Sequence, residues 1–158
     1  MAPGKISAGI LLYRRTRGAL EVFLVHPGGP YWKNKDEGAW SIPKGEVGSE
    51  TDYLAVAKRE FFEETSFRIE DCSRDEFIAL RPVKQKNGKT VYAFAVEGDI
   101  DAVRIRSNTC FIEWPPRSGK HVEIEEVDRG EWFTIEEARV KINAGQAGLL
   151  NKLDEKLE

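Results

Sequence analysis

Arg59-Glu-Phe-Phe-Glu-Glu64, with Gly45 fourteen residues upstream of Arg59, is the most informative stretch of this chain. Three carboxylates, Glu60, Glu63 and Glu64, crowd one short segment beside an arginine. Like charges at helical spacing destabilise a helix by about 0.2–0.5 kcal/mol per pair. A divalent cation turns that cost into binding, because hard cations such as Mg²⁺ take carboxylate and phosphate oxygens as ligands. The stretch therefore predicts a metal site that handles phosphates.

The residues from 52 to 65 have the spacing of an amphipathic helix. Apolar side chains recur at i, i+3 and i+7, namely at Leu54, Ala57 and Phe61. Glu60 and Glu64 are i,i+4 neighbours, and Glu63 lies three residues from Glu60, so the three acids share an adjoining face. Arg59 precedes Glu63 by four residues, which is close enough for the two side chains to pair. The helix thus presents one apolar face and one acidic face.

The alternative is a solvated charged face, because acid pairs such as Glu63 and Glu64 are common on amphipathic helices. The preceding segment favours the metal site. Trp40-Ser-Ile-Pro-Lys-Gly45 reads as a strand end that runs into a glycine-containing loop, and the helix follows it. Backbone groups in a loop that enters a helix are well placed to meet phosphate oxygens.

With these residues in place, the segment 45–67 resembles the signature of the Nudix hydrolases. That signature is a glycine followed at fixed spacing by Glu, Arg-Glu, Glu-Glu, a second glycine and an apolar residue. This chain supplies, at the required spacing, Gly45, Arg59, Glu60, Phe61, Glu63, Glu64 and Phe67. The resemblance implies the α/β class, with a Nudix-type α/β/α sandwich around a mixed β-sheet. It also implies a single domain over residues 1–158.

The chain departs from the signature at two positions. Thr51 replaces the first Glu, with Glu50 beside it, and Ser66 replaces the second glycine. The resemblance implies that the first Glu matters less than the Arg-Glu and Glu-Glu core. A glycine at a helix end often takes a left-handed conformation, and a serine there costs about 1 kcal/mol or less. Thr51 is also the expected helix N-cap, with Asp52 near the positive end of the helix dipole.

The resemblance further implies a metal-dependent pyrophosphohydrolase. Glu60, Glu63 and Glu64 are its expected metal ligands, with Mg²⁺ as the cofactor and Mn²⁺ as an alternative. Arg59 is expected to orient these carboxylates. The implied reaction is hydrolysis of a pyrophosphate bond in a nucleoside diphosphate that is linked to another group X.

Nudix enzymes often bring a further late Glu to the metals, as a ligand or as the general base. Here Glu126 is the first choice and Glu123 the second. Side chains alternate along an extended segment, so Glu126 and Asp128 are expected on one face, and Glu123 and Glu125 on the other. The alternative is that these acids only solvate a loop.

Four further residues are candidates for substrate binding. Lys44 precedes the signature glycine, and the resemblance suggests that its ammonium meets a phosphate. Tyr31, Trp32 and Trp114 lie in or beside loops, where an aromatic ring is able to stack on a nucleobase. A solvated lysine and aromatic packing over the core are the alternatives. His26 is not expected to be a ligand, because nothing in the sequence places it near the acids.

Several substrates fit this prediction. The segments 7–15, 40–45 and 131–138 resemble the diadenosine tetraphosphate hydrolase branch, which favours diadenosine polyphosphates or nucleoside triphosphates. Inositol pyrophosphates stay open, because a lysine-rich site tolerates any polyphosphate. The rival function is a Nudix-fold module that binds a nucleotide or polyphosphate with little or no turnover. Thr51 and Ser66 are the features that keep this rival open.

Composition sets further bounds. The chain has 158 residues and a net charge of −3, which argues against general attraction to nucleic acid. Cys72 and Cys110 suggest reduced thiols in the cytoplasm rather than a disulfide framework. No apolar run approaches the length of a membrane span. The short apolar run 6–13 precedes Arg14-Arg15, the wrong order for a secretory signal. The oligomeric state is left open.

Strands are expected both before and after the signature helix in the sequence. Asn87-Gly88 is a strong signal for a tight hairpin. The expected strands are residues 7–14, 22–26, 39–42, 77–83, 91–96, 109–114 and 131–134, with helices at 135–143 and 148–157 and a break near Gly145.

Overall fold

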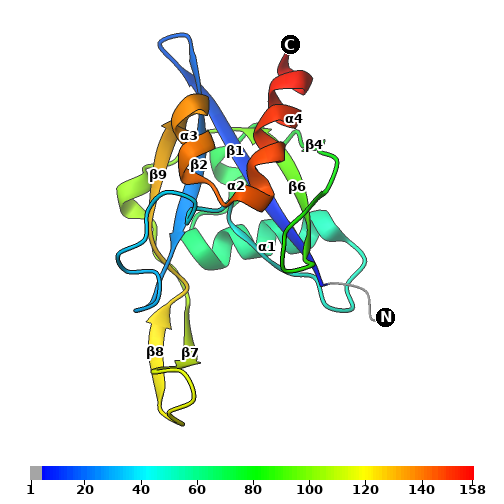
Figure 1. The fold of residues 1–158 in the computed structure, drawn as a ribbon. Helices are drawn as coiled ribbons and strands as arrows, with labels where there is room; N and C mark the ends of the chain where they lie inside the picture. The colour runs from blue at the N-terminus through cyan, green and yellow to red at the C-terminus, as the bar shows by residue number, and fades with distance from the viewer. Residues whose placement is uncertain (1–4) are drawn as a thin grey trace.

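A mixed β-sheet forms the centre of the computed structural model, which describes residues 5–158 (Figure 1). Its strands are β1 (Ile6–Thr16), β2 (Ala19–Pro27), β3 (Lys44–Glu46), β4 (Ile78–Ala79), β5 (Val83–Lys84), β6 (Thr90–Glu97) and β9 (Val127–Thr134). The order is β4-β6-β1-β2-β9, with β3 paired to β1 and β5 to β6. β1 runs parallel to β6 and antiparallel to β2 and β3. The mixed sheet is therefore confirmed.

Helices cover both faces of this sheet. They are α1 (Tyr53–Thr65), α2 (Ile69–Cys72), α3 (Ile135–Lys141) and α4 (Ala147–Leu157), with short 3₁₀ turns η1 (Ala102–Arg104) and η2 (Ala144–Gln146). Successive side chains of a strand point to opposite faces. Accordingly, Ile10 packs with Phe61 of α1, while Leu11 packs with Leu150 of α4, in two separate core clusters. The three-layer α/β/α sandwich is confirmed.

The N-terminal end of α1 differs from the expectation, whereas its C-terminal end agrees with it. Asp52, not Thr51, is the N-cap, and its carboxylate accepts a hydrogen bond of 3.1 Å from the backbone N–H of Ala55. Ser66 caps the other end with φ 66°, so it keeps the left-handed conformation expected of the missing glycine. Its hydroxyl donates to the carbonyl of Arg106 at 2.6 Å, which helps to hold this conformation.

Most other predicted elements are confirmed, and the differences come from long-range pairing. The predicted strand 39–42 is wrong: Trp40 and Ser41 form only isolated bridges, and the strand that joins the sheet is β3. The predicted strand 77–83 is split into β4 and β5, which pair with opposite ends of β6. The hairpin turn at Asn87-Gly88 is present.

A two-stranded hairpin stands apart from the main sheet. It consists of β7 (Thr109–Glu113) and β8 (His121–Glu125), and in Figure 1 it extends from the body below β9. The sequence predicted β7 but not β8. Glu126 lies where this hairpin joins β9. Within residues 5–158, no helix has the length and apolar character needed to cross a membrane.

Candidate functional site

The acidic face of α1 lies against the segment that contains Gly45. Apolar burial of Val56, Ala57 and Phe61 fixes the rotation of the helix on the sheet. As a result, Glu64 is buried with 7% exposure, whereas Glu60 and Glu63 are partly exposed. A Cβ atom added to Gly45 would overlap the Glu60 carboxylate. The signature glycine thus gives the acid its space, a role that needs no unusual backbone angle.

A cavity of about 230 Å³ opens beside these acids. We call it the acid cavity, and it is lined by Val25, Pro27, Ser41, Ile42, Lys44, Glu64, Glu126 and Val127. Its walls come from the end of β2, the segment before β3, helix α1 and the start of β9. Three residues that are far apart in the sequence, Lys44, Glu64 and Glu126, are therefore brought together.

The charges of the site repel one another. Burial raises the pKa of Glu60 to about 7, and the charges of Glu63 and Glu126 add to this shift while Arg59 opposes it. Burial likewise raises the pKa of Glu64 well above its usual value, with Lys44 opposing the shift and Glu126 and Glu60 adding to it. The carboxylates thus have too few positively charged neighbours to offset their burial and mutual repulsion.

Lys44 has the opposite shift. Burial lowers the pKa of its ammonium group, while the charge of Glu64 works against the lowering. An anion bound beside Lys44 would stabilise its charged ammonium group. This placement agrees with the predicted contact to phosphate, which stays a prediction.

The donor set fits a hard divalent cation. Among residues 5–158, no three acidic, histidine or cysteine side chains already converge closely enough to form a metal cage. Carboxylate oxygens are the ligands that Mg²⁺ prefers. A bound cation would also offset the charge repulsion that adds to the raised pKa values of Glu60 and Glu64. Glu60, Glu63 and Glu64 remain the residues that would hold it.

Arg59 has a partner that the sequence did not reveal. Its guanidinium donates to Glu50 at 2.8 Å, whereas Glu60 and Glu63 lie 3.9 Å from it. The expected pair with Glu63 is present but long. Glu50, the neighbour of Thr51, therefore supplies a carboxylate to the arginine beside the acids.

Asn108 is a second residue that sequence reasoning missed. Its side-chain amide donates to Glu126 Oε1 at 3.2 Å, and its backbone N–H donates to the carbonyl of Glu63 at 2.8 Å. Its own carbonyl accepts from the backbone N–H of Glu126 at 3.1 Å. Asn108 thus joins the acid segment of α1 to the start of β9. No local pattern signals these contacts, because they span 18 and 45 residues.

Glu126 and Glu123, the two candidates for the late acid, lie in different parts of the fold. Glu126 borders the acid cavity, whereas Glu123 is exposed on β8 and accepts from the hydroxyl of Thr109 at 3.0 Å. The expectation that Glu126 and Asp128 share one face is wrong. The β2–β9 register shifts between His26 and Pro27, and this bulge turns Asp128 toward His26.

The aromatic candidates do not line the acid cavity. Tyr31 and Trp32 form an edge-to-face pair at 4.9 Å in residues 28–38, which we call the aromatic loop. This loop begins directly after Pro27, a cavity residue, and Tyr31 is 56% exposed. Trp114 lies at the far end of β7, in the turn of the protruding hairpin, and the structure does not bring it to the acids.

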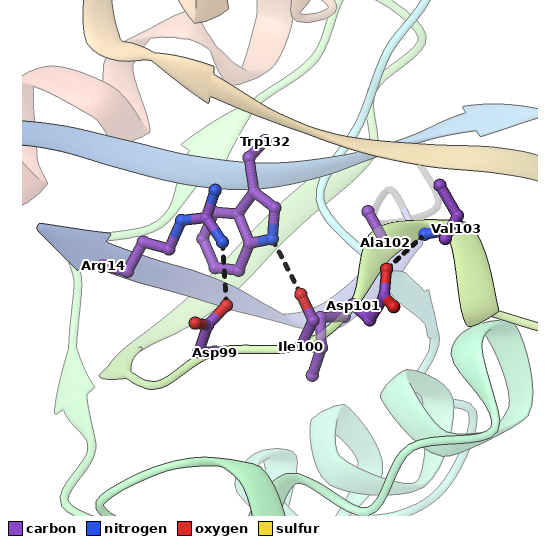
Figure 2. A pocket seen from close by; sticks show the side chains of 7 residues that line it. All are labelled: Arg14, Asp99, Ile100, Asp101, Ala102, Val103 and Trp132. Carbon is purple, nitrogen blue, oxygen red and sulfur yellow. Dashed lines mark hydrogen bonds and ion pairs between the residues drawn. The ribbon is translucent and has the colours of Figure 1, made fainter. Parts of the chain in front are cut away.

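A second, larger cavity of about 560 Å³ lies elsewhere (Figure 2). Its polar groups bond to one another: Arg14 donates to Asp99 at 2.8 Å, and the indole N–H of Trp132 donates to the carbonyl of Ile100 at 3.0 Å. The Arg14 guanidinium also stacks on the Trp132 ring at 4.1 Å. None of the predicted site residues lines this cavity, so the acid cavity is the better candidate.

Comparisons with known proteins agree with this arrangement. The family model for the NUDIX domain matches residues 4–153. A Caenorhabditis elegans Ap4A hydrolase in a binary complex is similar with TM-score 0.62 and 23% identity, over 97% of each chain. The NUDIX domain of Shewanella oneidensis NrtR, complexed with ADP ribose, has TM-score 0.67 and 12% identity, over 100% of this chain and 91% of that one.

A third solved structure is a mutT/nudix family protein from Listeria innocua. It has TM-score 0.63 and 17% identity, over 99% of this chain and 96% of the other. At these identities the likeness is one of fold. None of the curated proteins compared with this chain matches it.

Proposed function

This chain belongs to the Nudix family, and from that premise we propose that it is a pyrophosphohydrolase that hydrolyses a nucleoside diphosphate linked to another group X with Mg²⁺ as its cofactor. The observation that carries the proposal is the acid cavity, where Lys44 meets Glu64 and Glu126. A cation-binding acid face beside a partly buried lysine suits a polyphosphate, which brings its own metal and its own negative charge.

Each residue has a proposed role. Glu60, Glu63 and Glu64 would hold the metal, and Arg59 would orient Glu60 and Glu63 while bonded to Glu50. A bound Mg²⁺ offsets charge on the phosphate and acidifies a coordinated water. Glu126 is positioned by Asn108 to take a proton at its carboxylate. Mn²⁺ is the expected substitute metal.

Among substrates we favour diadenosine polyphosphates or nucleoside triphosphates. The exposed ring of Tyr31 supports a nucleobase, since aromatic faces stack on any base, whereas Trp32 is partly buried and packs against the core. Two similar folds belong to an Ap4A hydrolase and to a domain complexed with ADP ribose, which agrees with a nucleotide substrate. A cytoplasmic location is part of the proposal, because Cys72 and Cys110 are free thiols.

A second candidate is a binding module with little turnover. It is favoured by Thr51 in place of the first signature Glu and by the lack of a preformed three-ligand cage among residues 5–158. The intact acids of α1 and the placement of Glu126 favour the enzyme. Inositol pyrophosphates remain the alternative substrate for the same site.

A substrate panel tests the proposal. Diadenosine polyphosphates, nucleoside triphosphates, nucleotide sugars and inositol pyrophosphates are incubated with Mg²⁺, Mn²⁺ or a chelator, and products are identified by mass. We expect metal-dependent cleavage of a nucleotide, reduced at least about 100-fold by Glu64→Gln, which removes charge from a metal ligand. The exposed Glu155→Gln is the matched control. Binding of nucleotides without cleavage of any substrate would establish the binding module instead.

A further inference from the structure

His26 is a buried histidine with both ring nitrogens engaged by oxygen atoms. The side chain has 0% exposure. Its Nδ1 lies 2.9 Å from Asp128 Oδ1, and its Nε2 lies 2.6 Å from the carbonyl oxygen of Lys35. A carbonyl oxygen only accepts hydrogen bonds, and so does an ionised carboxylate. Each ring nitrogen therefore faces an acceptor, a geometry that an imidazolium satisfies by donating two hydrogen bonds.

The surroundings support this charge. Asp128 has a side chain that is 32% exposed and lies 4.0 Å from Arg129. A neutral imidazole would direct a lone pair at one of these two acceptors, which is unfavourable for a ring that is shielded from solvent. The other charged groups nearby, Asp36 and Lys141, pair with each other.

His26 connects a strand end, the loop that follows it and a bulge about a hundred residues away in the sequence. It belongs to β2, its Asp128 partner belongs to the bulge in β9, and its Lys35 partner belongs to the aromatic loop. The ring also packs edge-to-face on Trp40 at 5.2 Å. One buried side chain thus contacts a strand end, a bulge and a loop together.

These contacts of His26 adjoin the acid cavity through β2. Val25 and Pro27, the neighbours of His26 in β2, line the cavity, while His26 itself packs against Trp40 outside it. The backbone N–H of Gly28 donates to the carbonyl of Glu126 at 3.0 Å. The bond to Asp128 therefore acts on the segment that carries Glu126, and the bond to Lys35 acts on the loop that carries Tyr31 and Trp32.

We infer that His26 is a positioning residue that, as a buried imidazolium, sets Glu126 and the aromatic loop relative to each other without touching the substrate. The inference rests on the proposed function of this site. Its two hydrogen bonds serve different tasks. The Asp128 bond aligns the residue that takes a proton, whereas the Lys35 bond places the residues that meet the nucleobase.

Two neutral variants separate these tasks. In His26→Gln, the amide nitrogen takes the position of Nε2 and keeps the bond to Lys35, but loses the bond to Asp128. In His26→Asn, the amide takes the position of Nδ1 and keeps Asp128, but loses Lys35. We expect His26→Gln to lower kcat roughly 10–100-fold with little change in KM, and His26→Asn mainly to raise KM. His121→Gln is the matched control, because His121 is exposed on β8.

Nuclear magnetic resonance tests the charge itself, without any substrate. The chain contains two histidines, so ring ¹⁵N labelling gives few signals, and His121→Gln assigns them. We expect two ring N–H signals from His26 at neutral pH, both protected from exchange with water. A single ring N–H would overturn the imidazolium.

The inference also fails if both His26 variants match His121→Gln in kcat and KM. If the wild-type protein cleaves nothing in the substrate panel, the proposed function fails, and hydrogen exchange then decides the inference. Faster exchange in the aromatic loop of His26→Asn, and at residues 126–129 of His26→Gln, supports the positioning role. Exchange equal to that of His121→Gln in both segments overturns it.

Discussion

Gly45 and the Glu60 carboxylate occupy adjoining space, and a side chain at position 45 would overlap that carboxylate. The glycine at the start of the signature is thus required by close approach to an acid of α1. Its backbone is outside the positive-φ region, unlike that of Gly48, so conformational freedom does not explain it. This contact fixes how closely the segment with Gly45 approaches α1.

Gly45→Ala is expected to push Glu60 away and to lower activity roughly 10–100-fold, because misplacement by about 1 Å is costly at a reacting centre. The fold should persist, since Gly45 lies at the edge of the core. Gly148→Ala, where an added Cβ meets ordinary contacts at 3.5 Å, is the control. Steady-state kinetics over a Mg²⁺ titration provide the measurement. An unchanged Mg²⁺ dependence in Gly45→Ala would contradict the role assigned to this contact.

Glu126 and Glu123 provide a matched pair for the general base. Glu126→Gln is expected to lower kcat about 10²–10⁴-fold with little change in substrate affinity, as for loss of a general base. Glu123→Gln should leave kcat unchanged, because Glu123 is exposed and lies outside the acid cavity. A loss confined to Glu123→Gln would transfer the role to the hairpin.

Asn108 should act through Glu126. Asn108→Ala removes the side-chain bond to Glu126 Oε1 and is expected to lower kcat roughly tenfold, since groups that orient a catalytic side chain contribute about this much. Asn108→Asp should lower kcat further, because it places a like charge beside Glu126. Asn151→Ala on α4 is the control. If Glu126→Gln removes the difference between Asn108→Ala and wild type, the two residues act together; additive losses would refute this coupling.

The metal-free protein is expected to lose stability as pH rises. Burial raises the pKa of Glu60 from 4.5 to about 7, so the folded state binds a proton more tightly than the unfolded state. The stabilising contribution is complete below about pH 4.5 and is lost as pH rises through about 7. Thermal unfolding in a chelator, followed from pH 5 to 8, measures this trend.

Two comparisons sharpen the pH experiment. Glu60→Gln should flatten the pH dependence of the melting temperature, because the amide does not titrate. Mg²⁺ should raise the melting temperature more at pH 8 than at pH 5, since the ionised carboxylates bind it. A melting temperature in chelator that rises between pH 5 and 8, and is unaffected by Glu60→Gln, would contradict the raised pKa.

Sequence patterns predicted the elements whose order is local. The helix period places Glu60, Glu63 and Glu64 on a face that adjoins the apolar one, and in α1 Glu64 is buried as Phe61 is, while Glu60 and Glu63 are partly exposed. The left-handed end at Ser66 agrees with the glycine that the Nudix signature has at this position. The prediction of a strand at 39–42 was wrong because β1 pairs with residues 44–46 instead. The side chains of residues 39–42 do not by themselves decide this pairing.

Local periodicity therefore determined the acidic helix, and the resemblance of residues 45–67 to the Nudix signature indicated the family to which the chain belongs. Tertiary structure decided which late acid reaches the helix, that Asn108 and Glu50 join the site, that Trp114 stays outside it, and that His26 lies behind it. The physical reason is the range of the interactions. A helix fixes neighbours by its own 3.6-residue repeat, whereas the bulge at Asp128 exists only once β2 and β9 have paired across the sheet.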